Sequence, residues 1–140
     1  MTDAVKTNLS SASQAAMPVL IVLSAAHFLN DMIQSLIPAI YPIIKSAYAL
    51  DFGQIGMITL TFQVTASLFQ PLVGHVTDKR SMPYSMVVGM GFTLVGLIVL
   101  AYASSYAFLV LGAGLVGTGS SIFHPEATRL ARQASGGRQG

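Results

Sequence analysis

The sequence contains no cysteine, which excludes a disulfide framework, a thiolate zinc site and thiol chemistry. Charged residues are also scarce, at 9% of the 140 residues, whereas a soluble domain carries about 25%. The formal net charge is +2 and the seven Lys and Arg residues form no dense patch, so nucleic-acid binding has no support. Apolar residues make up 53% of the chain instead. This composition predicts a membrane protein.

Long apolar runs predict an all-α membrane protein with four transmembrane helices within residues 17–134. A helix crosses a hydrocarbon core of about 30 Å with roughly 20 predominantly apolar residues. Four runs meet this length, at about residues 18–44, 54–76, 82–103 and 106–128. Gly89, Gly91 and Gly96 in the third run, and small residues such as Gly114 and Gly117 in the fourth, favour close packing of helices.

Polar segments flank the membrane region. Residues 1–16 are rich in Ser, Thr and Ala and predict a disordered tail. Residues 135–140 are glycine-rich and are interpreted as a cytoplasmic linker to a missing fifth helix. Six of the seven basic residues would lie on one side of the membrane and only Lys45 on the other. Because Lys and Arg concentrate in cytoplasmic loops, we expect the N-terminus in the cytoplasm.

The first span carries a polar face in its middle. His27, Asn30, Asp31 and Gln34 are three or four residues apart, so they share one side of a helix. An Asp at mid-membrane costs roughly 2.5–3.5 kcal/mol on insertion scales. The thirteen Leu, Ile, Val and Phe residues of 19–44 offset this at roughly 0.3–0.6 kcal/mol each. Asp31 is therefore the first candidate for function, and passive helix–helix hydrogen bonding is the alternative for its neighbours.

The sequence gives little support for a metal site, a cofactor or an enzyme at this polar face. A metal ion at His27 and Asp31 would need further ligands, and nothing nearby in the sequence supplies them, so we expect no metal and no cofactor. No serine–histidine–acid order, phosphate loop or aligned carboxylate pair has usable spacing, so we expect no enzyme. Pro38 and Pro42 predict a bend toward the second end of this span. Asp51 is expected to cap the next helix.

Two further groups of residues are candidates for function. His124 and Glu126 lie near the end of the last span. They are expected either in the same cavity as Asp31 or in the headgroup layer, where they would form the polar end of the helix and have no functional role. The segment Gly74 to Arg80 combines a glycine with Asp78, Lys79 and Arg80. An acid at a helix end beside bases suits a latch between helices, and we call these four residues the latch segment.

Two motifs resemble the major facilitator superfamily of secondary transporters. Gly74-x-x-x-Asp78-Lys79 resembles the superfamily's loop between helices two and three, although Arg80-Ser81-Met82-Pro83 departs from its glycine and further bases. The superfamily also has an arginine on helix four, but the corresponding position here is Ala113, so the role of that arginine is not carried over to this chain. A more specific resemblance, to the fosmidomycin resistance branch, rests on His27-Phe28-x-Asn30-Asp31 and Gly119-Ser120-Ser121-x-Phe123-His124-Pro125-Glu126-Ala127. It covers about residues 17–138.

The resemblance implies that the four spans are part of one six-helix half of a two-half bundle. It further implies proton-coupled export of a small molecule by alternating access, in a bacterial inner membrane. Asp31 would exchange protons, His27 would tune it, and the latch segment would stabilise one state. The partners implied are the substrate, protons, the lipid bilayer and the remaining helices. The competing hypothesis is a small four-helix membrane protein, either an oligomeric exporter or a non-transporting assembly partner.

Overall fold

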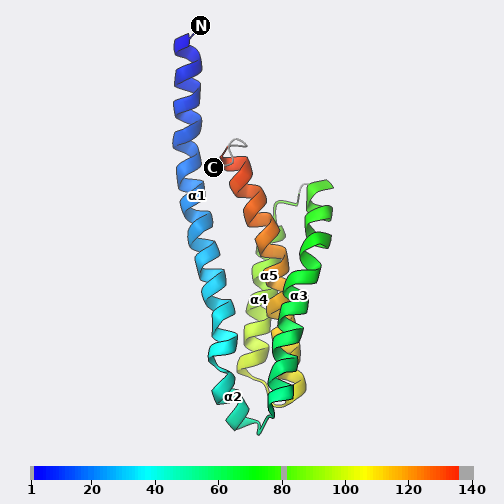
Figure 1. The fold of residues 1–140 in the computed structure, drawn as a ribbon. Coiled ribbons are helices and arrows are strands. Elements are labelled where there is room, and N and C mark those ends of the chain that lie inside the picture. The colour runs from blue at the N-terminus through cyan, green and yellow to red at the C-terminus, as the bar shows by residue number, and fades with distance from the viewer. Residues whose placement is uncertain (1, 80–81, 136–140) are drawn as a thin grey trace.

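The computed structural model describes residues 2–79 and 82–135, with side chains from residue 17 onward except that of Asp78. The described chain is helical: α1 (Thr2–Ala39), α2 (Tyr41–Ala47), α3 (Phe52–Lys79), α4 (Ser85–Ala101) and α5 (Tyr106–Ala134). The long helices lie side by side and alternate in direction (Figure 1). Both termini lie at one end of the bundle, here called the terminal end, and α2 lies at the other, the loop end. The predicted all-α class is confirmed.

Three segments of the described chain are long and apolar enough to cross a membrane: Met17–Ala47, Phe52–Thr77 and Tyr106–Ala134. The fourth predicted span is α4, with 17 residues. At 1.5 Å per residue α4 is about 26 Å long, near the lower limit for a span. It starts later than the sequence predicted because Pro83 and Tyr84 form a turn first, closed by the Ser85 N–H donating to the Met82 carbonyl at 3.1 Å.

The first span breaks where its prolines predicted a bend. α1 ends at Ala39 and α2 begins at Tyr41, with a turn between Pro38 and Pro42. At its other end α1 begins at Thr2, whereas the sequence predicted a disordered tail over 1–16. Each residue added to an existing helix gains one backbone hydrogen bond, and Ala is the best helix former, so the Ala-containing segment continues the helix.

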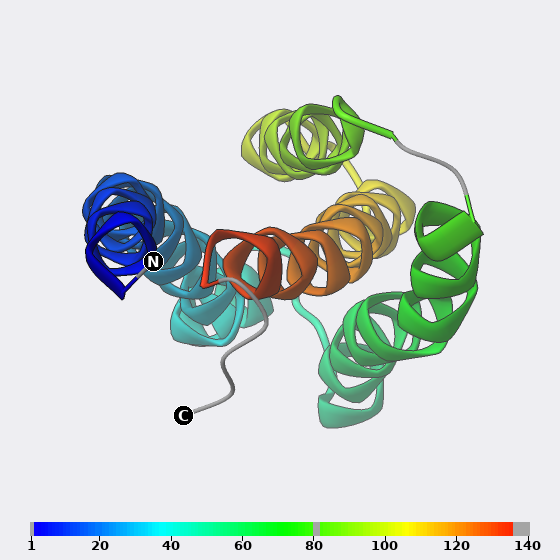
Figure 2. The same cartoon turned by 90° about the horizontal axis from the view of Figure 1, so that it is seen from above.

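α5 is the central helix of the bundle. It packs along α3 and α4 and makes a less extensive contact with α1, and Figure 2 shows it surrounded by the other three. Glycines set how closely the backbones approach. A Cβ built on Gly96 of α4 would lie 2.7 Å from Val116 Cγ2, and one on Gly117 of α5 would lie 2.5 Å from the Phe62 carbonyl oxygen. α3, α4 and α5 therefore form one closely packed unit, as the small residues predicted.

The loop end is held together by apolar packing and by helix caps. The Gln54 N–H donates to Asp51 Oδ1 at 2.7 Å, and the Asp51 N–H donates to Gln54 Oε1 at 3.0 Å. This reciprocal pair is a capping box and confirms Asp51 as the cap of α3. The buried core lies toward the same end and comprises Ile37, Ile44, Leu50, Ile58, Phe62, Leu109, Ala113 and Val116.

Candidate functional site

Ionisable side chains of α1 and α5 meet between these two helices. His27 Nε2 lies 3.3 Å from Asp31 Oδ2, one turn along α1. His124 Nε2 on α5 lies 4.0 Å from Asp31 Oδ1, and the Gln34 amide nitrogen lies 3.3 Å from the same His124 nitrogen. We call His27, Asp31, Gln34 and His124 the α1–α5 cluster. The structure thus brings together four of the six residues that the sequence assigned to one cavity.

The local fold explains this arrangement. The i, i+4 spacing stacks His27 and Asp31 on adjacent turns. From α5, the buried ring of Phe123 contacts the His27 ring with centroids 5.9 Å apart, and the His27 and His124 rings meet edge to face at 5.0 Å. The side chains of His27 and Asp31 are 45% and 52% exposed, while that of His124 is 26% exposed. The carboxylate is accessible, and the two imidazoles are positioned by aromatic contact.

Asn30 lies apart from the accessible cluster. Its side chain is fully buried, at 0% exposure. Among the described residues, neither its amide nitrogen nor its oxygen has a hydrogen-bond partner, and the buried Ser120 hydroxyl has none. Leaving a buried polar group unpaired costs about 1–3 kcal/mol. Asn30 therefore does not line the opening that exposes Asp31.

Glu126 belongs to a second, buried network. Its side chain is 1% exposed. The Ser85 hydroxyl of α4 donates to Glu126 Oε2 at 2.6 Å, and the Arg129 guanidinium donates to both carboxylate oxygens at 2.7 and 3.3 Å. The side chain of Thr77 of α3, whose hydroxyl donates to the Gly74 carbonyl at 3.3 Å, lies beside this carboxylate. The carboxylate joins α3, α4 and α5, so it lies neither beside Asp31 nor at the helix surface.

The latch segment lies at the terminal end of α3. A Cβ on Gly74 would stand 4.0 Å from Pro125 Cβ, so this glycine lies next to α5 where that helix contains its proline. α3 continues to Lys79, whose side chain is exposed. The Asp78 side chain and Arg80 lie outside the described residues.

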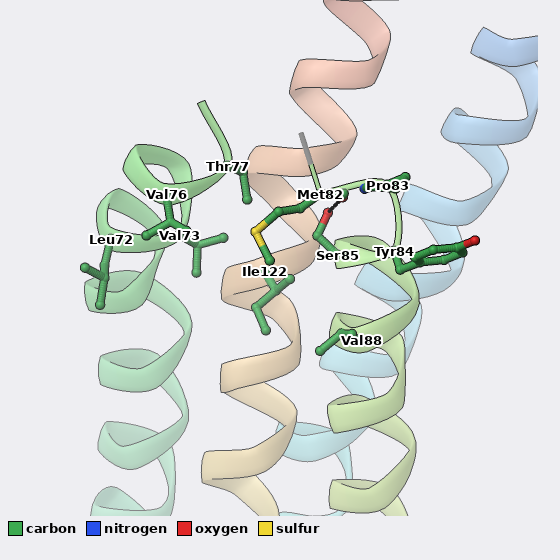
Figure 3. A pocket seen from close by; sticks show the side chains of 10 residues that line it. All are labelled: Leu72, Val73, Val76, Thr77, Met82, Pro83, Tyr84, Ser85, Val88 and Ile122. Carbon is green, nitrogen blue, oxygen red and sulfur yellow. Dashed lines mark hydrogen bonds between the residues drawn. The ribbon is translucent and has the colours of Figure 1, made fainter. Parts of the chain in front are cut away.

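Several cavities open near this end of the bundle. One of about 420 Å³ lies between α3 and α4 above Ile122, and Figure 3 shows it lined mainly by apolar side chains such as Val73, Met82 and Val88. It does not reach the α1–α5 cluster. Another, of about 300 Å³, lies between α3 and α5 and is lined by Gln70, Gly74, Thr77, His124, Pro125, Thr128, Arg129 and Arg132. It brings a polar, basic lining to His124.

Sequence reasoning missed the partners of Glu126. Arg129 follows Glu126 by three residues, a spacing that places both on one helix face, so this pair was readable. Ser85 and Thr77 come from other helices and carry no local signal. The sequence offered the cavity of Asp31 as one of two places for His124, but only the packing of α5 on α1 shows that His124 is a third ligand-type side chain beside His27 and Asp31. The ligand atoms of these three residues lie within 4.8 Å of one another.

Apolar helices with an ionisable cluster between two of them are typical of membrane transport proteins, and residues 23–140 match the Major Facilitator Superfamily. The chain belongs to this superfamily and is a multi-pass membrane protein. It is 61% identical over 122 residues to the fosmidomycin resistance protein of Escherichia coli K12, covering 87% of this chain and 30% of that protein.

Two further relatives match the chain at lower identity. The chain is 41% identical over 123 residues to an uncharacterized MFS-type transporter of Bacillus subtilis, covering 88% of this chain and 30% of that protein. It is 27% identical over 107 residues to protein spinster homolog 1 of Xenopus laevis, covering 75% of this chain and 20% of that protein. The chain therefore spans less than a third of the length of these relatives. No solved structure matches it.

Proposed function

We propose that the chain is part of a proton-coupled secondary transporter that exports a small, fosmidomycin-like molecule by alternating access. One observation carries this proposal: Asp31 and His124, from α1 and α5, approach to 4.0 Å in a chain of the Major Facilitator Superfamily. The name of the Escherichia coli relative supports the drug-like substrate. Arg132, which lines the cavity that reaches His124, would favour an anionic one.

The proton would act through the charge of Asp31. A carboxylate in a membrane bundle is stabilised by protonation or by partners, because ionised groups are costly to remove from water. A protonated Asp31 would let α1 and α5 close over the site, and release of the proton would open it to water. His27, at 3.3 Å, would tune this exchange as a hydrogen-bond partner. Gln34 would hold His124 in place.

The proposal includes the orientation of the chain and the role of the latch segment. The distribution of basic residues favours a cytoplasmic terminal end in a bacterial inner membrane. The contact between Gly74 and Pro125 supports a latch in which Gly74, Asp78, Lys79 and Arg80 stabilise one of the alternating states. The competing small four-helix protein is not favoured, because the bacterial relatives are much longer than this chain.

Asp31→Asn tests the coupling step. The amide is close in size but cannot exchange a proton, so we expect proton-driven export by the intact transporter in proteoliposomes to be lost. Exchange of labelled for unlabelled substrate, which moves no net proton, should persist. Asp51→Asn is the matched control, because Asn caps a helix as well as Asp and position 51 lies at the loop end. Unchanged export by the Asp31 variant at several pH values would remove Asp31 from coupling.

A further inference from the structure

The α1–α5 cluster contains three side chains of the types that ligate transition metals. Zn²⁺ takes imidazole nitrogens and carboxylate oxygens at about 2.0–2.2 Å, so tetrahedral ligand atoms stand roughly 3.3–3.6 Å apart. His27 Nε2 and Asp31 Oδ2 are already 3.3 Å apart. His124 Nε2 is 4.0 Å from Asp31 Oδ1, and the three ligand atoms lie within 4.8 Å of one another. Small side-chain rotations would close the remaining gap.

The surroundings hold these donors in place and leave an entry path. His27 and Asp31 form a two-ligand chelate on one helix face, since residues four apart are neighbours. His124 comes from a second helix and is restrained by its ring contact with His27 at 5.0 Å. The Asp31 side chain is 52% exposed, so an ion in water can reach it. The Gln34 amide nitrogen lies 3.3 Å from His124 Nε2, so a half-turn of this amide group would bring its oxygen to the fourth position, which water could also fill.

We propose that His27, Asp31 and His124 form a binding site for a divalent transition-metal ion, with Zn²⁺ as the best match. Two imidazoles and one carboxylate suit Zn²⁺ better than Mg²⁺ or Ca²⁺, which take mainly oxygen ligands. The ion would join α1 to α5, the pair of helices with the less extensive contact. The proposal does not rest on proton coupling or export, because it concerns binding by these three side chains alone.

The experiment is a zinc titration of the intact protein in detergent micelles, without a polyhistidine tag, against a chromophoric chelator. We expect one Zn²⁺ per chain, with affinity reduced at least tenfold in His27→Gln and in His124→Gln. His75→Gln is the matched control: it is the third histidine of this chain, it is exposed on α3, and it lies outside the cluster. Its affinity should equal that of the unaltered protein.

Two outcomes would overturn the site. One is equal zinc affinity in the unaltered protein and in a His27→Gln, His124→Gln double variant whose helical content is unchanged. The other is a loss in His75→Gln as large as in the cluster variants. The visible absorption spectrum of bound Co²⁺ gives a second measurement that does not depend on the stability of the variants, since imidazole ligation changes this spectrum. A chelator removes zinc from the protein. Transport measured with the chelator present therefore tests the proposed function separately from zinc binding.

Discussion

Gly91 and Gly96 lie on the same helix, α4, in opposite surroundings. A Cβ on Gly96 would approach Val116 Cγ2 to 2.7 Å and the Gly112 carbonyl oxygen to 2.9 Å, whereas a Cβ on Gly91 would meet nothing within 4 Å among the described residues. The sequence predicted close packing at both positions, and for Gly91 that prediction is wrong. The spacing of glycines shows that a helix has small residues, but the facing helix decides which of them it needs.

This difference gives a matched pair of substitutions. Gly96→Ala forces apart α4 and α5, where part of the obstruction is backbone, and should destabilise the protein by about 1–3 kcal/mol. Gly91→Ala meets no obstruction and should stabilise α4 by about 0.5–1 kcal/mol, because alanine is the better helix former. Unfolding of both variants in mixed micelles with increasing denaturing detergent measures the two effects. Equal stabilities would contradict the close contact at Gly96.

The candidate site shows the same limit at single residues. The spacing of His27 and Asp31 correctly predicted that they are neighbours, because i, i+4 geometry is local. It did not predict that Asn30, one residue before Asp31, is fully buried while Asp31 is 52% exposed. Nor did it show that Glu126 has Ser85 as a partner, since that contact joins residues of different helices.

Whole helices were more predictable than their contacts. Apolar length predicted the four long helices, prolines predicted the break between α1 and α2, and Asp51 predicted the start of α3. These signals are local in the chain. The central position of α5 is not, because it depends on glycines of one helix meeting the surface of another. The continuation of α1 to Thr2 likewise depends on the helix that follows, because residues are added to it cooperatively.

The orientation of the spans can be tested at the ends of two helices. The chain has no cysteine, so single introduced cysteines react without background. Ser46 near the end of α2 and Gln133 near the end of α5 are both exposed. If the terminal end is cytoplasmic, a membrane-impermeant maleimide should label Ser46→Cys in intact cells and Gln133→Cys only after permeabilisation. The reverse pattern would contradict the proposed orientation.

At the scale of the whole molecule, the two ends of the bundle differ in how they are held. The loop end contains the apolar core and a hydrogen bond from the Tyr48 hydroxyl to the Ala103 carbonyl. The terminal end contains cavities and the Glu126 network. In Figure 1, α1 extends beyond the end of α5 at the terminal end, where α5 no longer lies beside it. Movement at this end would therefore disturb less packing than movement at the loop end.

The latch segment lies at that end, so Asp78→Ala should change the rate of conversion between states. We expect turnover of the intact transporter to fall severalfold while its affinity for substrate stays the same, because Asp78 is not one of the residues of the α1–α5 cluster. Asp3→Ala, which also removes one acid, serves as the control. Transport rates and equilibrium substrate binding measure the two properties. Normal turnover in the Asp78 variant would reduce the segment to a topology signal.

The Glu126 network has a consequence for biosynthesis. Ser85 and Thr77 precede Glu126 in the chain, and Arg129 follows it by three residues. When the ribosome delivers α5 to the insertion machinery, Ser85 and Thr77 are already in the bilayer, and the Arg129 donor arrives within one turn. An unpaired buried carboxylate would be costly there, but this one meets its partners on arrival. The three-helix unit can therefore assemble during translation, with its charge neutralised, before any later segment is made.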